Sequence, residues 1–496
     1  MMDKRKSILN VSVSITCKLI TMLMVIWVRR TLIRFCGNEV NGLNALYLSI
    51  VGFLSVAELG VGSAITFCMY KPIVAGDHNK VSALYHLFRR LYLLIGGVIF
   101  LSGLAVTPFI HVFAKDYAAL DVNMYLTFVL MLLSVVLTYL FASKTALMNA
   151  YKNNYITTTI QSSGLILQYV LQIAVVYVTH SFVWYLVCRI VAVLVQWALT
   201  ELAARKRYLP ILVNKQSLDQ ETKRDVTVSI KAMFMHQIGN VLVNTVDSVV
   251  ISFFVGVIAL GKYSNYITIL SAMNGVIVLV FTSLTSVVGH LYAETDREKS
   301  KRHCDRFHDL NFVIGTVFFL GYYGVIDNLI AILFFETLVV EKSVSFVITL
   351  NGFVQFMRQS VLVFRNASGT FYYDRWKPLF EEITNLVLSV VLVRKMGVTG
   401  VIAATILTNL LICHVAEPYV LYRYAFSASP KAYYKKNYGM ILLFTVSLCI
   451  LHGMLRQMDD QWIELLVNGC LSVGVSGVVC IIAAVLRKEG NAHGRD

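Results

Sequence analysis

The chain has 496 residues, of which 57% are apolar and only 14% are charged. A soluble protein is about 45–50% apolar and about 25% charged, so a soluble fold of this composition would expose large apolar patches. The formal net charge of +15 fits basic cytoplasmic loops better than a nucleic-acid site. These values exclude a soluble globule and predict an all-α integral membrane protein without a nucleic-acid partner.

A transmembrane helix needs about 20 mostly apolar residues at a rise of about 1.5 Å per residue. This criterion predicts about fourteen transmembrane helices, at 8–35, 43–69, 91–113, 123–150, 157–179, 182–204, 232–255, 263–291, 309–335, 344–369, 378–396, 398–421, 438–455 and 463–486. The longest connection lies between the sixth and seventh of them. The predicted domains are an N-terminal six-helix bundle (1–206), a cytoplasmic linker (207–231), a second six-helix bundle (232–425), and the final two transmembrane helices with a tail (426–496).

Most of the 43 Lys and Arg residues fall in alternate connections, including 70–90, 205–231 and 292–306. Basic residues mark the cytoplasmic side of a membrane protein, and an even number of helices puts both termini on one side. We therefore expect a multi-pass protein of the bacterial cell membrane, with both termini in the cytoplasm. No predicted loop is long enough for a folded domain, which argues against a membrane polymerase or ligase.

The two halves resemble each other weakly at an offset of about 220 residues. Phe35-Cys36-Gly37 and the glycine at 42 parallel Phe254-Val255-Gly256 and the glycine at 261, with the same glycine spacing. Structural repeats around a site near the membrane midplane are a common plan of secondary transporters. This similarity predicts two pseudo-symmetric six-helix bundles plus two C-terminal helices.

Ionisable residues at membrane depth are costly, and they mark substrate paths or partners. By the rise per residue, Lys18 and Arg358 lie near the middle of their predicted helices. Arg29 and Arg365 lie on the same polar faces, although snorkelling toward the interface is an alternative for both. Asn244 belongs to a polar face of the seventh helix. The predicted substrate-binding residues for a large anionic ligand are Lys18, Arg29, Asn244, Arg358 and Arg365, because Arg and Lys bind phosphate strongly.

Two acidic residues, Glu58 and Asp247, are predicted to bind a coupling ion or to pair with these cations. If Lys18 and Arg358 are merely structural, Glu58 or Asp247 would be their partners. H⁺ and Na⁺ are the candidate coupling ions, and the membrane potential is a third energy source. No Gly-rich phosphate loop, His/Cys ligand spacing or catalytic constellation occurs, so we expect no enzyme, no cofactor and no metal site.

Several segments carry a resemblance to a known family. They are GNEVNGLNALYLSIVGFLSVAELGVGSAITFCMYKP at 37–72, TVDSVVISFFVG at 245–256, GKYSNY at 261–266 and FYYDRWKPLFEEITNLVLS at 371–389. Along nearly its whole length the chain resembles the bacterial repeat-unit flippases of the multidrug/oligosaccharidyl-lipid/polysaccharide exporter superfamily. It departs from their usual Gly-Thr pair in the twelfth helix, where it has Ala404-Thr405.

The resemblance implies two six-helix bundles around a cationic cavity, and alternating access. It implies a substrate, an undecaprenyl-pyrophosphate-linked oligosaccharide, which is flipped for capsule, exopolysaccharide or O-antigen synthesis. Membrane lipids, a polysaccharide polymerase and glycosyltransferases are the expected partners. The alternatives are an ion-coupled multidrug antiporter of the same superfamily, a membrane-embedded polymerase or ligase, and a non-transporting scaffold.

Overall fold

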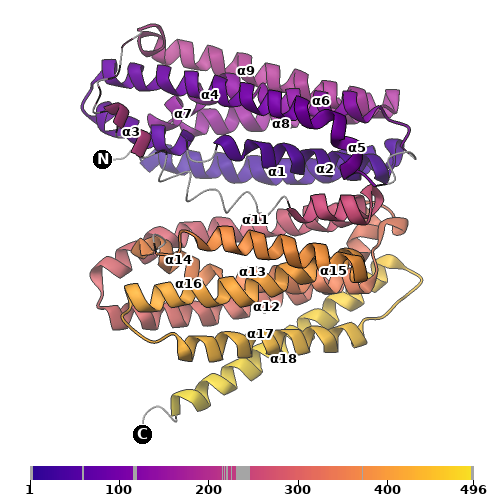
Figure 1. Ribbon diagram of the computed structural model, residues 1–496. Coiled ribbons are helices and arrows are strands. Elements are labelled where there is room, and N and C mark those ends of the chain that lie inside the picture. The colour runs from indigo at the N-terminus through magenta and orange to yellow at the C-terminus, as the bar shows by residue number, and fades with distance from the viewer. Residues whose placement is uncertain are drawn as a thin grey trace. The chain divides into compact units, whose positions relative to one another are not determined.

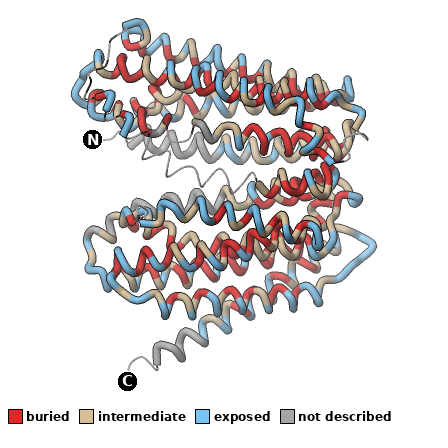
Figure 2. Tube along the Cα trace, in the orientation of Figure 1, coloured by how far each residue is buried: buried red, intermediate tan, exposed pale blue. Residues whose placement is uncertain are grey.

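The computed structural model describes residues 4–58, 61–115, 120–214, 246–370 and 373–492, together with separate positions between 216 and 230. These residues are almost entirely helical, and the described ranges contain no strand. Within them, nine helices are long and apolar enough to cross a membrane. Exposed residues run along these helices (Figure 2), and many are large and apolar, such as Leu101 (67% exposed), Trp184 (53%) and Ile481 (66%). The predicted all-α membrane fold is confirmed.

The chain divides into two compact units, Met1–Gly261 and Lys262–Asp496. In the first unit, α1 packs against α8, α8 against α9, and α4 against α7. Its helices, the indigo to magenta ribbons of Figure 1, are α1 (Lys4–Cys36), α2 (Asn38–Leu54), η1 (Ser55–Glu58), α3 (Val61–Val74), α4 (His78–Val106), η2 (Thr107–Phe109), α5 (Ile110–Phe113), α6 (Met124–Val136), α7 (Tyr139–Ala150), α8 (Asn154–Thr179) and α9 (Phe182–Val213).

The second unit is built around α12, which packs against α13 and α18, while α13 packs against α15. The unit begins inside α11 (Val257–Glu294), the helix that continues from the first unit. Its other helices, drawn in rose to yellow in Figure 1, are α12 (Arg297–Leu333), η4 (Glu336–Leu338), α13 (Lys342–Met357), α14 (Gln359–Ser368), α15 (Lys377–Thr408), η6 (Asn409–Cys413), α16 (His414–Val420), η7 (Leu421–Ala425), α17 (Lys431–Met454) and α18 (Gln461–Ala492).

Several segments predicted as single helices are interrupted in the structure, and two of them illustrate the cause. The segment 43–69 becomes α2, η1 and α3, and the segment 123–150 becomes α6 and α7. At each break a hydroxyl bonds a carbonyl of the preceding turn: Ser55 at 2.8 Å and Thr138 at 2.7 Å. Such bonds compete with the backbone ladder and bend helices. Hydropathy does not detect these breaks, because the residues around them stay apolar.

Close backbone contact joins the two segments that the internal repeat relates, both within the first unit. Gly37, before α2, and Gly256, before α11, have positive φ values of 92° and 130°. A Cβ on Gly42 of α2 would lie only 1.9 Å from the carbonyl oxygen of Val257. Two side-chain amides of α2 donate hydrogen bonds to this segment. Asn38 donates to the Ile258 carbonyl at 2.9 Å, and Asn41 donates to the Gly261 carbonyl at 3.2 Å. The first glycine of each segment therefore allows the turn before its helix, and Gly42 allows the close contact between the two helices.

Candidate functional site

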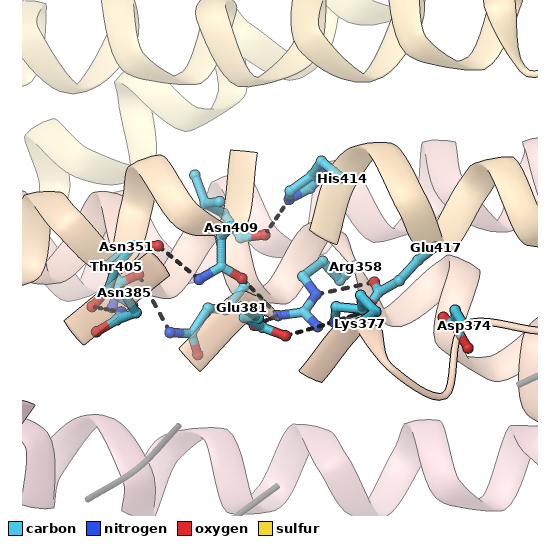
Figure 3. Close-up of polar contacts among 12 residues, drawn as sticks. Asn351, Arg358, Asp374, Lys377, Glu381, Asn385, Thr405, Asn409, His414 and Glu417 are labelled. Atoms are coloured by element: carbon cyan, nitrogen blue, oxygen red, sulfur yellow. Dashed lines mark hydrogen bonds and ion pairs between the residues drawn. The ribbon is translucent and has the colours of Figure 1, made fainter. Parts of the chain in front are cut away.

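A buried cluster of charged residues lies at the breaks and ends of helices in the second unit (Figure 3). Arg358 stands at the junction of α13 and α14, where the helical hydrogen-bond ladder is interrupted. Lys377 and Glu381 lie in the first turns of α15, and Glu417 lies on the short helix α16. Helix breaks leave backbone groups open to side-chain partners, so this region can hold polar side chains away from water.

Arg358 and Glu417 form the central pair of this ionic cluster. The Arg358 Nη2 and Nε atoms donate to Oε1 and Oε2 of Glu417 at 2.6 and 3.1 Å, which is a two-pronged contact. The third guanidinium nitrogen, Nη1, donates to the Asn409 side-chain oxygen at 2.6 Å. It also lies 3.5 Å from Glu381. A planar guanidinium suits this bidentate geometry, and a lysine could not reproduce it.

Lys377 joins the two carboxylates of the cluster. Its Nζ lies 2.7 Å from Oε1 of Glu417 and 2.7 Å from Oε2 of Glu381. Arg365 of α14 pairs with Asp374, and its Nη1 lies 3.9 Å from the same Oε1 of Glu417. Three cations therefore surround one carboxylate oxygen.

The connection between α14 and α15 contributes Asp374, outside the spanning helices. Burial raises the pKa of the Asp374 carboxyl, and the Arg365 guanidinium opposes this rise. The Asp374 side chain is 6% exposed. The Arg365 guanidinium therefore favours the charged form of the carboxyl, which burial disfavours.

The cluster balances three cations (Arg358, Arg365 and Lys377) with three carboxylates (Asp374, Glu381 and Glu417), and all six side chains are largely buried. The two arginine side chains keep 15% and 14% of their surface exposed, whereas that of Glu417 keeps 1%. Removing one partner of a buried ion pair typically costs about 3–5 kcal/mol, because the other charge stays behind. The arginines therefore form the accessible edge of the cluster.

The helix that carries Glu417 has an irregular backbone on both sides. Two π-helical turns, η6 and η7, flank α16, and π-turns inside α-helices occur mostly at functional sites. Pro418 follows Glu417 inside α16 and cannot donate a backbone hydrogen bond. His414 Nε2 donates to the Val354 carbonyl at 3.0 Å, which leaves Nδ1 to accept from Asn437 at 2.9 Å, as in a neutral imidazole.

The structure brings two of the predicted substrate-binding residues, Arg358 and Arg365, into one cluster. Lys18 and Arg29 are not in it. Lys18 is exposed on α1, Arg29 is partly buried on the same helix, and Asn244 lies outside the described residues. Their predicted role in binding remains a prediction.

The proposed pairing of Arg358 with Glu58 or Asp247 is not what the structure contains, since its partners are Glu417 and Glu381. Glu58, in the first unit, accepts hydrogen bonds from Tyr92 at 2.8 Å and Tyr139 at 2.6 Å. Asp247 is buried, at 9% exposure. Their coupling role remains a prediction.

Sequence reasoning identified neither Glu417 nor Glu381 as a member of this cluster. A hydropathy profile does not single out either residue, because each lies beside a long apolar run. The spacing of Lys377 and Glu381, four residues apart at a helix start, was an available signal. Glu417 directly before a proline was another. No group of three or more His, Cys, Asp or Glu suited to a metal occurs among the residues described.

Apolar helices that bury an ionic cluster are typical of a multi-pass membrane protein. No protein-family model matches the sequence, and no curated protein matches it either. Solved structures do. The lipid II flippase MurJ, in an inward closed conformation, superposes with a TM-score of 0.66 at 12% identity, over 97% of this chain and 99% of that one.

An inward-facing multidrug resistance MATE family transporter of the MOP superfamily gives a TM-score of 0.64 at 15% identity, over 84% of this chain and 97% of that one. A eukaryotic MATE transporter gives 0.57 at 12% identity, over 88% of this chain and 99% of that one. The chain therefore has the fold shared by MurJ and the MATE transporters of the MOP superfamily, with about fourteen transmembrane helices.

Proposed function

We propose that this protein is a flippase that carries undecaprenyl-pyrophosphate-linked oligosaccharide repeat units from the inner to the outer leaflet by alternating access. It works in the cytoplasmic membrane of a bacterium, with both termini inside, and serves capsule, exopolysaccharide or O-antigen synthesis. It is not an enzyme, and polymerase and glycosyltransferases act beside it. H⁺, Na⁺ or the membrane potential drives it, with Glu58 and Asp247 as candidate coupling residues.

The observation that carries this proposal is the extent of the fold match. The lipid flippase structure matches 97% of this chain, and the MATE transporter 84%. The difference, about 64 residues, is close to the length of the segment 426–496, which holds α17 and α18. We assign this additional length to the lipid-linked cargo, which a drug antiporter does not carry.

An apolar cavity between α17 and α18 is consistent with a substrate that has a lipid part. Its volume is about 780 Å³, within the range of ligand pockets. Aliphatic side chains form both walls, including Leu443, Ile450, Leu466 and Val478. A prenyl chain is an occupant of matching chemistry, because burying each CH₂ contributes about 0.8 kcal/mol.

An ion-coupled multidrug antiporter is the alternative function, because a MATE transporter has a similar fold. A cationic drug calls for an acidic site. The buried ionic cluster balances three cations with three carboxylates, and its arginines are its most exposed members. This charge pattern favours an anionic cargo.

Deletion of the gene in a strain without a redundant flippase tests the proposal. We expect lipid-linked repeat units to accumulate on the inner leaflet and the surface polymer to disappear, because synthesis continues while translocation stops. Mass spectrometry of extracted lipids and immunoblotting of the polymer give the two readings. The intact gene on a plasmid, as control, should restore both. Normal polymer together with changed drug sensitivity would establish the antiporter instead.

A further inference from the structure

We propose that Glu417 occupies an anion-binding cradle formed by Arg358, Arg365 and Lys377, and that the diphosphate of the cargo takes its place during transport. The inference rests on the proposed function, and it adds how the head group is bound. Oε1 of Glu417 receives Arg358 at 2.6 Å and Lys377 at 2.7 Å, with Arg365 at 3.9 Å. Such a convergence of cations is what a phosphate requires.

The charge balance shows why the exchange is feasible. With Glu417 in place, three cations meet three carboxylates. With Glu417 withdrawn, only Asp374 and Glu381 remain to oppose them, and the cradle carries a net positive charge. A diphosphate oxygen accepts the same bidentate bonds from Arg358, so the desolvated guanidinium is never left unpaired.

Access to the cradle is from the arginine side. The Arg358 and Arg365 side chains are 15% and 14% exposed, whereas that of Glu417 is 1% exposed. An approaching anion therefore meets the guanidinium groups first. Glu417 withdraws on its own side, away from the incoming ligand.

The backbone around α16 provides the movement. The turns Asn409–Cys413 and Leu421–Ala425 each hold the extra residue of a π-turn. Converting one of them to an α-turn shifts α16 by a residue and rotates Glu417 by about 100° around the helix axis. Pro418 lowers the cost, because one backbone hydrogen bond is already missing there. Asn409, in the first π-turn, holds Arg358 in place through its side-chain oxygen at 2.6 Å.

Binding of farnesyl diphosphate to the full-length protein in lipid nanodiscs tests the inference, with farnesol as the uncharged probe. The variant Glu417→Gln removes the competing charge, so it should bind farnesyl diphosphate at least about tenfold tighter and farnesol as before. The matched control is Glu201→Gln, because Glu201 is also held by two cations, Lys144 and Arg205, but in the first unit. Unchanged affinity of Glu417→Gln for farnesyl diphosphate, or an equal gain in the control, would contradict the proposed anion-binding cradle.

A second variant covers the case in which Glu417→Gln does not fold. Arg358→Lys keeps the charge but loses the two-pronged guanidinium contact, so farnesyl diphosphate should bind about tenfold weaker with farnesol unchanged. Equal affinity overturns the inference. Failure of the cradle and failure of the flippase are separable. If the wild-type gene restores polymer while neither variant changes diphosphate binding, only the cradle is wrong. If the variants behave as expected while gene deletion leaves polymer intact, the cradle stands and the oligosaccharide substrate is wrong.

Discussion

At the scale of single residues, the cluster shows how a charge is held inside apolar helices. Arg358 uses all three guanidinium nitrogens, two on Glu417 and one on Asn409. The sequence identified Arg358 and Arg365 because a basic residue interrupts an apolar run. It could not identify Glu417 as their partner, since the two glutamates and the arginines are brought together only by tertiary packing of α13 to α16.

Replacing Arg358 by Gln should lower the free energy of unfolding by about 3 kcal/mol, because Glu417 is left buried with fewer partners. The double variant Arg358→Gln with Glu417→Gln should regain part of this loss. Thermal unfolding of the detergent-purified proteins measures both. Arg205→Gln is the matched control: its side chain is 66% exposed in a pair with Glu201, so it should change stability by less than about 1 kcal/mol. Equal losses in the two single variants would contradict the burial argument.

At the scale of helices, hydropathy predicted most spans but few of their interruptions. One interruption was predicted: the segments 378–396 and 398–421 were expected as separate helices, and the backbone is non-helical at Gly397 between them, with φ 56° and ψ −135°. The break at Arg358 and the two π-turns depend on side-chain partners that hydropathy does not represent. The repeat glycines were visible in the sequence, whereas their contact with each other was not.

Gly42→Ala should push α2 away from α11, because the added Cβ would lie 1.9 Å from a backbone oxygen that cannot move aside. Overpacking of this kind costs about 1–3 kcal/mol, and polymer export should fall with it. Gly97→Ala is the control, since no atom lies within 4 Å of its Cβ position and it sits inside helix α4. That variant should be neutral or more stable by up to about 1 kcal/mol. Thermal stability and surface polymer are measured for both, and a neutral Gly42→Ala would refute the close contact.

At the scale of the whole molecule, composition alone predicted an all-α membrane protein, and the fold confirms it. The orientation in the membrane follows from the distribution of basic residues and remains a prediction. The domain boundaries at 206, 231 and 425 also remain predictions. The compact units divide after Gly261, inside α11.

Single cysteines can be placed in a variant that lacks the nine native cysteines. Their labelling should then report the side of the membrane on which each one lies. A cysteine at Lys80 or Lys299 should react only with a membrane-permeant maleimide, because both connections are expected in the cytoplasm. A cysteine at Asp459, between α17 and α18, should react with an impermeant reagent on intact cells. If the cysteine at Lys80 reacts with an impermeant reagent, the predicted orientation is inverted. The membrane depths assigned from that orientation are then wrong as well.

The contact between α2 and the start of α11 has a consequence for the ancestry of the chain. If two like segments once met as identical copies, each would have offered its asparagines to the other, as in a self-complementary dimer. The glycines persist in both segments, at 37 and 42 and at 256 and 261, whereas the positions equivalent to Asn38 and Asn41 hold Val257 and Leu260. Fusion into one polypeptide releases the two copies from identity. One side can then keep the amides while the other offers only its carbonyls.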